Sequence, residues 1–322
     1  NTLSSMPHSL TPSSASPAPR MLVVLLGPTG VGKTALSLAL AERLGCPILN
    51  ADSRQIYRHM PIGTAAPTPA ERQRVHHYFV EELEPDDYFS AARYETEALK
   101  VLEREFSQRP VCLMAGGSMM YLDAVCHGID DIPTIDNDTR QLLRQRYERE
   151  GLQPLVEELR LLDPAYYTQV DLRNPKRVVH ALEVCYMTGR TFTSYRLGRR
   201  VQRPFGILKI GLNLPREELF ARINSRVWHM VEAGLADEAR SLLPYRHCNA
   251  LNTVGYKEMF RHLDGEWTLE QAVLKIQRNT RIYAKKQLTW FAKDQSIHWL
   301  RPDDLDGALQ RIAEGMKQQD SI

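Results

Sequence analysis

The stretch GPTGVGKT constrains the fold of this chain more than any other part of the sequence. It follows MLVVLLG, an apolar run typical of a buried parallel strand, and leads into KTALSLALAERLG, whose apolar residues recur at helical spacing. A complete Gly-x4-Gly-Lys-Thr pattern between a strand and a helix predicts a phosphate loop, because backbone N–H groups converge there on an anion. Its residues are Gly27, Pro28, Thr29, Gly30, Val31, Gly32, Lys33 and Thr34.

The last two residues of the loop suggest how the anion is held. Lys33 adds a positive charge, and the hydroxyl of Thr34 can ligate Mg²⁺ that bridges phosphate oxygens, so Mg²⁺ is the expected cofactor. The pattern leaves the kind of phosphate open. A nucleoside triphosphatase carries an acid at the end of another core strand, but the run PVCLMAGGS ends without one. This lack, and the absence of the guanine-selecting NKxD pattern, disfavours a standard ATPase or GTPase.

Alternating strand-like and helix-like segments place the loop in an α/β fold. The strand-like runs at 21–27, 46–52 and 110–117 predict a P-loop NTPase-like parallel sheet wrapped by helices. Beyond Pro133 the chain is charged and helical until FGILKIGLNLP returns to strand character, which predicts an inserted all-helical domain. The expected organisation is a disordered tail at 1–20, the first part of the core at 21–133, the helical insertion at 134–200, and the second part of the core with a basic C-terminal helix at 201–322.

Composition sets limits on class and compartment. The 322 residues carry 41 Lys and Arg against 39 Asp and Glu, a formal net charge of +2, so a basic surface requires uneven distribution. The five cysteines are scattered without a CxxC pair, which is typical of a reducing compartment, and no apolar run reaches membrane-spanning length. The Ser- and Pro-rich residues 1–20 lack the apolar core of a secretory signal. We expect a cytoplasmic monomer that does not bind membranes.

Asp52 is the acid nearest to the loop at the end of a strand-like run. It falls at the carboxyl edge of the predicted sheet, where ligands bind in open α/β folds. A carboxylate beside a phosphate site can act as a Mg²⁺ ligand or as a general base toward an acceptor. The local sequence is equally compatible with a helix N-cap, because residues 53–57 can begin a helix.

Five blocks in a fixed order give the chain a resemblance to a known family. GPTGVGKT, DSRQIYRHMPIGTA, HHYFVEELEPDDYFSAARY, AGGSMMYLDAV and NTVGYKEM resemble blocks of the tRNA dimethylallyltransferases, also called tRNA isopentenyltransferases. The likeness runs from about Leu22 to Leu300, and the DSRQIY and VGY blocks are specific to that family. It implies transfer of a prenyl group from dimethylallyl pyrophosphate to N6 of the adenosine next to the anticodon (position 37) in tRNA, with the anticodon stem-loop as partner.

The resemblance also implies catalytic roles. The phosphate loop would hold the pyrophosphate of the prenyl donor, which explains the missing strand-end acid. Asp52 matches the family's proposed general base, which takes a proton from the adenosine amino group. Ser118 and Arg226 match positions that meet the diphosphate or the transferred carbon, although ARINSRVWHM taken alone favours a solvated helix face.

RNA contacts implied by the resemblance fall in several segments. The acceptor base must be unstacked to reach a pocket; Gln55 is a candidate to read its edge, whereas Tyr256 is also compatible with a core position. The family often has Thr at Ser118, Lys at Ala66, Arg at His180 and Gln at Ile282, so some RNA contacts are expected to differ. The implied RNA-binding residues are Asp52, Ser53, Arg54, Gln55, Ser118, Arg140, Lys176, Arg177, Val178, Val179, His180, Asn252, Thr253, Val254, Gly255, Tyr256 and Lys257.

A basic helix gives support for RNA that does not depend on the resemblance. QAVLKIQRNTRIYAKKQLTWFAK contains Lys and Arg but no acid, and at about 100° per residue its cations fall within an arc of roughly 140°. Such a stripe predicts salt-dependent phosphate binding, although charged helix faces are often only solvated. The cations are Lys275, Arg278, Arg281, Lys285, Lys286 and Lys293, and the opposite side is expected to hold Ile276, Tyr283, Ala284, Trp290 and Phe291.

Two further enzyme classes and one binding class remain open at this stage. A small-molecule P-loop kinase would use Lys33, Thr34 and Asp52, with Asp52 activating a hydroxyl. A prenyltransferase acting on free adenine nucleotides shares the loop and the acid but needs no tRNA contacts. The helical insertion and the basic stripe favour tRNA, and a pure RNA-binding module would not need an intact phosphate loop.

Overall fold

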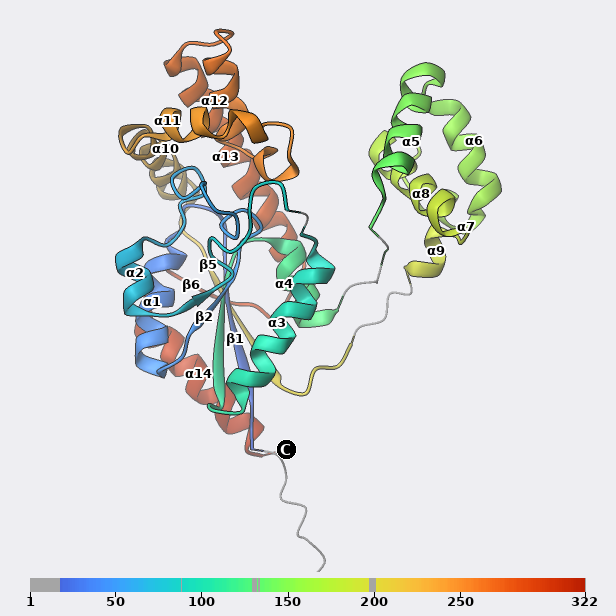
Figure 1. Cartoon of the computed structure of the whole chain (residues 1–322). Coiled ribbons are helices and arrows are strands. Elements are labelled where there is room, and N and C mark those ends of the chain that lie inside the picture. The colour runs from blue at the N-terminus through green and yellow to red at the C-terminus, as the bar shows by residue number, and fades with distance from the viewer. Residues whose placement is uncertain (1–17, 88, 129–131, 133, 197–200, 322) are drawn as a thin grey trace, which may run out of the picture.

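A single sheet of parallel strands forms the centre of the larger lobe (Figure 1). In the computed structural model, which describes residues 18–87, 89–128, 132, 134–196 and 201–321, the strand order is β3-β2-β4-β1-β5-β6. The strands are β1 (Met21–Leu26), β2 (Ile48–Ala51), β3 (His77–Tyr78), β4 (Val111–Gly116), β5 (Gly206–Leu212) and β6 (His298–Leu300). The predicted parallel α/β fold is confirmed, and the two short edge strands β3 and β6 are additions to the predicted set.

Strand β1 explains why the sheet has a core on each face. Its six residues are all buried, and alternate side chains point to opposite faces. Leu22, Val24 and Leu26 join one apolar cluster. Met21, Val23 and Leu25 join the other. Because β1 pairs with both β4 and β5, the phosphate loop that follows it emerges at the middle of the sheet.

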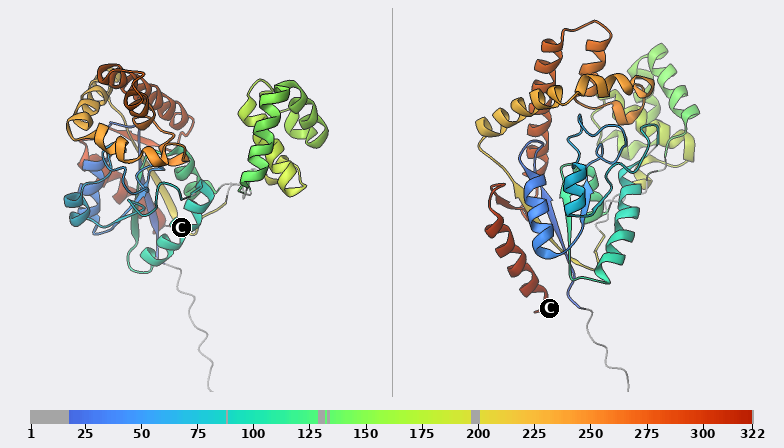
Figure 2. Two further views of the ribbon diagram at one scale, coloured as in Figure 1. Left: turned by 45° about the horizontal axis from the view of Figure 1, so that its top comes forward. Right: turned by 60° about the vertical axis from the view of Figure 1, so that its left-hand side comes forward.

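Helices cover both faces of the sheet. One face packs against α3 and α4, and the other against α1, α10 and α14 (Figures 1 and 2). The helices of the larger lobe are α1 (Lys33–Leu44), α2 (Pro69–Arg74), α3 (Ala91–Phe106), α4 (Met119–His127), α10 (Arg216–Glu232), α11 (Leu235–Ser241), α12 (Tyr256–Leu263), α13 (Leu269–Phe291) and α14 (Leu305–Gln319), with 3-10 turns η1 (Leu243–Tyr245) and η2 (Asn249–Leu251). None of the helices in the described part of the chain is both long and apolar enough to cross a bilayer.

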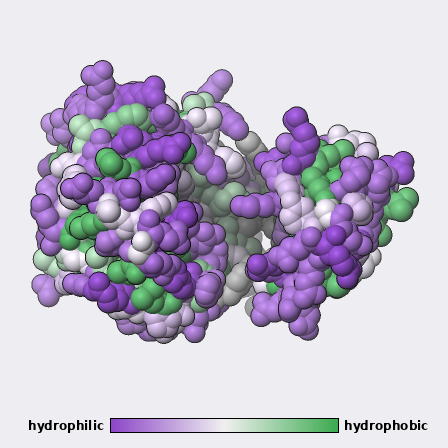
Figure 3. Space-filling view, turned by 90° about the horizontal axis from the view of Figure 1, so that it is seen from above, coloured by the Kyte–Doolittle hydropathy of each residue, from purple (hydrophilic) through white to green (hydrophobic). Residues whose placement is uncertain are grey.

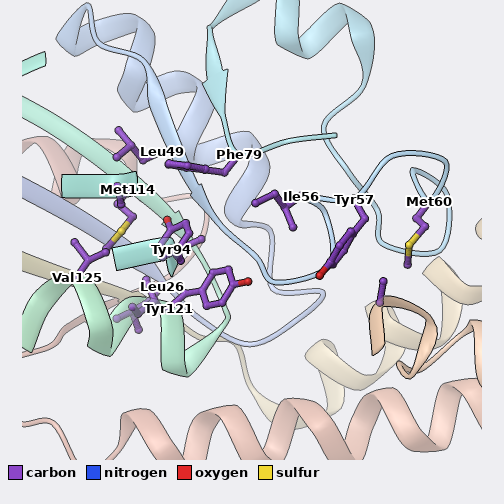
Figure 4. Close-up of a cluster of buried hydrophobic side chains, with 14 of the residues drawn as sticks. Leu26, Leu49, Ile56, Tyr57, Met60, Phe79, Tyr94, Met114, Tyr121 and Val125 are labelled. Carbon is purple, nitrogen blue, oxygen red and sulfur yellow. The ribbon is translucent and has the colours of Figure 1, made fainter. Parts of the chain in front are cut away.

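An aromatic layer lies between the sheet and helices α3 and α4. The Tyr94 and Tyr121 rings stack with centroids 4.3 Å apart, and Phe79 meets Tyr94 edge-on at 5.1 Å. The Tyr94 hydroxyl donates to the carbonyl of Asn50 at 2.8 Å, which satisfies its polar end within the core. This layer continues through Ile56 and Tyr57 toward Met60 (Figure 4), so it supports the turn that follows β2.

In the residues that the structure describes, a smaller lobe is built from helices alone: α5 (Asn137–Glu150), α6 (Leu152–Leu162), α7 (Pro164–Tyr167), α8 (Pro175–Thr188) and α9 (Phe192–Tyr195). It has its own apolar core, in which Leu143 and Leu155 are fully buried. Figures 1 and 2 show it as a body beside the larger lobe. Residues 1–17 of the predicted tail (1–20) lie outside the described residues. So do residues 133 and 200, where the borders of the helical insertion were predicted.

Candidate active site

A cavity of about 1190 Å³ opens at the carboxyl edge of the sheet, directly above the end of β1. Its lining includes the phosphate loop, the turn after β2, residues 63–65, the loop between β4 and α4, the residues before α12, and the inner faces of α10 and α13. The structure brings most of the predicted site residues into this one space. They are Thr29, Gly30, Gly32, Lys33, Thr34, Asp52, Ser53, Arg54, Gln55, Ser118, Arg226, Asn252, Thr253, Val254, Gly255 and Lys257.

Glycines in the phosphate loop are required by their surroundings. Gly30 and Gly32 have φ of 82° and 106°, in the left-handed region that side chains disfavour. A Cβ atom on Gly30 would lie 2.9 Å from Cγ1 of Ile223 in α10, so α10 packs directly on the loop. The remaining loop residues Gly27, Pro28 and Val31 are buried beneath the cavity wall.

Lys33 begins α1 and turns back over the loop. Its ammonium group donates to the carbonyls of Gly27 and Pro28, each at 2.8 Å. Burial lowers its pKa to about 7, with a smaller contribution from the nearby positive charge of Arg226, and the charge of Asp52 opposes the shift. A cation desolvated in this way gains stability from an incoming anion, because the anion replaces the lost hydration.

Arg226 points from α10 into the cavity, so the solvated face suggested by its local sequence is not observed. Its Nη2 donates to the hydroxyl of Thr29 at 2.8 Å. Burial lowers the pKa of the guanidinium, with a smaller contribution from Arg222 and an opposing one from Asp52. The loop is therefore flanked by two cations, Lys33 and Arg226, that lack full hydration.

Asp52 shapes a turn and lines the cavity, but residues 53–56 form a turn and no helix, so the N-cap alternative is not observed. Its Oδ1 accepts from the backbone N–H groups of Arg54 at 2.8 Å and Gln55 at 3.1 Å. The hydroxyl of Ser118 accepts from the backbone N–H of Ser53 at 2.8 Å. Ser118 thus braces the turn that carries the carboxylate, and both side chains are on the cavity wall.

The amide of Gln55 is already engaged within the protein. Its Nε2 donates to the carbonyl of Thr64 at 2.9 Å and to that of Ala65 at 3.2 Å, and its Oε1 accepts from Asn50 at 3.1 Å. It therefore holds the 64–65 segment against the turn after β2. Reading a base edge, as suggested by the sequence, requires these hydrogen bonds to be exchanged.

Two residues that were predicted to contact RNA have side chains buried within the protein. Tyr256 is fully buried, and its hydroxyl donates to Glu238 at 2.5 Å and to the carbonyl of Met60 at 2.9 Å. Val178 is fully buried in the core of the helical lobe. Each lies in a segment that was assigned to RNA binding as a whole, by its resemblance to the family. Such a resemblance does not tell which side chains of the segment face inward.

The helical lobe exposes most of the other residues that were matched in it. Arg140 lies near the start of α5, and Lys176 and Arg177 lie in the first turn of α8; their side chains are exposed or partly exposed. Val179 and His180 are partly buried, and the His180 ring meets Phe192 edge-on at 5.5 Å. Seen from above, hydrophilic side chains predominate on both lobes (Figure 3).

Helix α13 presents its cations outward, as the stripe predicted. Lys275, Arg278, Lys285 and Lys286 are exposed, Arg281 is partly buried, and the exposed Lys293 lies just beyond the end of the helix. Among them only Lys286 is part of the cavity lining. The expected apolar side was partly wrong, because Tyr283 and Trp290 are 36 % and 37 % exposed.

Sequence reasoning missed several cavity residues on α13, among them Gln287 and Tyr283. Gln287 is 2 % exposed and hydrogen-bonds to the phosphate loop and to the carbonyl of Gly117. The phenol of Tyr283 lines the cavity; burial and the charge of Asp52 raise its pKa to about 12. The available signal for Gln287 was a polar amide between Ala284 and Phe291 on a helix face that is mostly apolar.

Comparison with known proteins gives consistent results. The family model described as IPP transferase matches residues 55–294. A tRNA dimethylallyltransferase 1 of Phocaeicola vulgatus is 58 % identical over 294 residues, covering 91 % of this chain and 98 % of the relative. Another of that name, from Bacteroides thetaiotaomicron, is 60 % identical over 291 residues, covering 90 % and 94 %.

A solved structure extends the likeness to three dimensions. The crystal structure of a tRNA isopentenylpyrophosphate transferase from Bacillus halodurans superposes with a TM-score of 0.69 at 34 % identity, covering 94 % of this chain and 98 % of that one. The family resemblance seen in the sequence is therefore confirmed. The chain belongs to the IPP transferase family, whose similar members are tRNA dimethylallyltransferases, and is a prenyltransferase.

Proposed function

We propose that this enzyme transfers the dimethylallyl group of dimethylallyl pyrophosphate to N6 of the adenosine next to the anticodon, at position 37 of tRNA. One observation carries the proposal beyond family membership: the phosphate loop and Asp52 line one cavity, and the charge of Asp52 acts on both Lys33 and Arg226. A donor held by its pyrophosphate at Lys33 and an acceptor amine beside Asp52 would then meet within the same cavity. The relatives' names support the tRNA acceptor.

The donor half of the site suits a pyrophosphate that departs. The loop amides, Lys33 and Arg226 supply positive charge on one wall of the cavity. As the bond between C1 of the allyl group and the pyrophosphate oxygen breaks, its electron pair leaves with the pyrophosphate. Fixed cations stabilise that developing charge most strongly where water is largely excluded.

The acceptor half supplies a base. As N6 of the adenosine forms its bond to C1, the amine must lose a proton, and the carboxylate of Asp52 would take it. The turn hydrogen bonds go to Oδ1, so we assign proton transfer to Oδ2. The products are N6-(dimethylallyl)adenosine in the tRNA, free pyrophosphate and a proton on Asp52 that later passes to solvent.

Mg²⁺ fits the oxygen donors on the cavity wall. The hydroxyl of Thr34 in the first turn of α1 is a hard ligand of the kind Mg²⁺ prefers, and substrate phosphates would complete the shell, which leaves Oδ2 of Asp52 free to act as the base. When bound, the ion would neutralise charge on the pyrophosphate. The contribution of the chain is to hold the Thr34 hydroxyl beside the loop.

The tRNA would be held by both lobes. The outward cations of α13 and those at the starts of α5 and α8 support binding of the anticodon stem-loop through its phosphates. This surface favours a tRNA acceptor over a free adenine nucleotide, because a free nucleotide is too small to use it. We further propose that the enzyme acts as a monomer in the cytoplasm.

A transfer assay tests the proposal directly. Purified protein with Mg²⁺ receives labelled dimethylallyl pyrophosphate and, in separate tubes, unmodified tRNA with adenosine at position 37, the same tRNA with guanosine there, AMP, or ATP. Label is expected only in the adenosine-37 tRNA. Label in AMP or ATP would make the enzyme a free-nucleotide prenyltransferase, and hydrolysis of ATP without transfer would return it to the kinase or ATPase class.

A further inference from the structure

Gln287 occupies an unusual position for a helix glutamine. It lies near the end of α13, is 2 % exposed, and forms part of the cavity wall. Its Oε1 accepts from the backbone N–H of Thr29 in the phosphate loop at 2.9 Å, and its Nε2 donates to the carbonyl of Gly117 at 2.9 Å. One side chain therefore joins two backbone segments that are distant in sequence.

The two joined segments carry the two halves of the site. Thr29 belongs to the loop proposed to bind the pyrophosphate, and Gly117 directly precedes Ser118, which braces the turn of Asp52. The fit is close: a Cβ atom on Gly117 would lie 2.6 Å from Nε2 of Gln287 and 3.1 Å from the carbonyl oxygen of Gly27. The bridge therefore sets the spacing between the loop and the β4–α4 segment.

Thr29 is also held from a second direction. Its hydroxyl accepts from Arg226 of α10 while its backbone N–H is bound by Gln287 of α13. Two helices that come late in the chain thus fix one residue of a loop that comes early. A loop that must offer its amides to an anion benefits from being fixed beforehand, because no ordering is then needed on binding.

We infer that Gln287 is a positioning residue for the pyrophosphate donor: it holds the phosphate loop and the Ser118 segment at the separation the reaction requires. This inference rests on the proposal that the loop binds the donor's pyrophosphate. Gln287 acts through Thr29 and Gly117. Its loss should therefore weaken donor binding and slow transfer without weakening tRNA binding.

The chain provides a matched control on the same helix. Gln277 is also buried, at 7 % exposed, and its Nε2 donates to a backbone carbonyl, that of Asn224 in α10, at 3.0 Å. It is outside the cavity lining. Gln277→Met and Gln287→Met each replace a buried amide on α13 by an apolar side chain of similar length, so the pair separates loss of a buried hydrogen bond from loss of the bridge.

The first experiment measures dissociation constants of dimethylallyl pyrophosphate with Mg²⁺, and of tRNA, for the wild type and both variants, with thermal melting as a check on folding. Gln287→Met should raise the donor constant about tenfold or more, because two buried hydrogen bonds are removed. The tRNA constant should stay within about twofold. Two results would overturn the inference: a dissociation constant for dimethylallyl pyrophosphate that rises as much in Gln277→Met as in Gln287→Met, or one that rises by less than about twofold in Gln287→Met.

A second variant, Gln287→Glu, tests the bridge through the pH dependence of donor affinity. In Gln287→Glu the ionised carboxylate keeps an acceptor for Thr29 but offers no donor to Gly117, whereas the protonated carboxyl reproduces both hydrogen bonds. The ratio of donor constants, variant over wild type, should therefore fall toward one between pH 8 and pH 5.5. A ratio that does not change with pH would contradict the bridge.

The same measurements separate this inference from the proposed function. A wild type that binds the donor, together with weakened binding in Lys33→Met, supports the proposed pyrophosphate site. Under that result, an unaffected Gln287→Met overturns the positioning role alone. A wild type that fails to bind dimethylallyl pyrophosphate with Mg²⁺ overturns the proposed donor site, and the positioning role falls with it.

Discussion

The guanidinium of Arg226 donates to the hydroxyl of Thr29 at 2.8 Å across 197 positions of sequence. This hydrogen bond places a cation from α10 beside the phosphate loop, where burial lowers its pKa. A cation held in this way costs stability in the empty protein. It is stabilised when an anion arrives, so it favours the bound pyrophosphate and the charge that develops on it.

Arg226→Ala should therefore lower kcat/KM for dimethylallyl pyrophosphate by about 100-fold or more, the usual effect of removing one preorganised charge. Arg226→Lys should recover only part of this activity, because an ammonium group cannot reproduce the geometry of the guanidinium. Steady-state kinetics at saturating tRNA test both. Full activity of Arg226→Ala would show that Lys33 and the loop amides alone are enough to stabilise the charge on the departing pyrophosphate.

The pKa of Lys33 predicts a proton linkage in donor binding. In the free protein its pKa is about 7, and a bound pyrophosphate would raise it. Below pH 7 Lys33 is already charged, so its contribution to affinity is constant. Above pH 7 the complex holds a proton that the free protein lacks, so affinity falls as pH rises until the pKa of the complex is reached.

Calorimetric titration at pH 8 in buffers of different ionisation enthalpy measures this uptake. Close to one proton should be taken up from the buffer per donor bound, because Lys33 is mostly neutral in the free protein at that pH. Lys33→Met should bind the donor weakly and should lack the proton uptake that Lys33 contributes. Any proton that the substrate itself gains or loses on binding is the same for both proteins and cancels in the comparison. Equal uptake in both proteins would assign the proton to another group.

The double role of Asp52 predicts a difference between two substitutions. Asp52→Asn keeps an Oδ1 that can accept from Arg54 and Gln55, so the turn should persist, but the amide cannot take the N6 proton. We expect kcat to fall by about 100- to 10,000-fold with tRNA affinity largely intact. Asp52→Ala should lose the turn as well as transfer. Circular dichroism, tRNA binding and single-turnover transfer together distinguish them, and near-normal turnover of Asp52→Asn would remove Asp52 as the base.

Much of this site could be anticipated because local patterns determine it. The phosphate loop, the strand before it and the acid after β2 are each encoded in a few adjacent residues, and parallel strands bring their carboxyl ends to one edge. The expected strand runs correspond to β1, β2, β4 and β5. The strands β3 and β6 were missed because their two and three residues carry too little periodicity.

The hydrogen bonds between distant segments could not be read from the sequence. Gln287 binds Thr29 at a separation of 258 positions, and the segment around it shows only an amphipathic helix. Tyr283 and Trp290 were expected on the core side, since aromatic residues usually are, but α13 borders open cavities there and leaves them partly exposed. Tertiary packing, which no local pattern reports, decides such positions.

Tyr256 illustrates the same limit and yields a test. Its hydroxyl donates to the carboxylate of Glu238, which also accepts from the backbone N–H groups of Ile62 and Gly63. Tyr256→Phe removes a hydrogen bond to a charged group, so the free energy of unfolding should fall by about 1.5–3 kcal/mol. Urea denaturation measures this decrease. Affinity for tRNA should stay within about twofold, and a large drop in affinity in a stable variant would restore Tyr256 as an RNA-binding residue.

The outward cations of α13 predict how RNA binding depends on salt. Removing one cation that pairs with a phosphate should reduce the slope of log affinity against log salt by about 0.7 to 0.9, depending on whether the RNA strand is single or paired there. Arg278→Ala and Lys285→Ala remove charges from this face, and Lys317→Ala removes an exposed charge from α14, the last helix of the chain. We expect each α13 variant to lower the slope for a tRNA anticodon stem-loop by about one, with donor affinity unchanged.

The α14 variant is the control for this experiment and should leave the slope at its wild-type value. A change confined to the two α13 variants would assign the stripe to phosphate binding, since all three substitutions remove one positive charge from the protein. If all three variants behave alike, the stripe is a solvated face. The tRNA must then rest on the cations of the helical lobe and on Lys257, which lines the cavity.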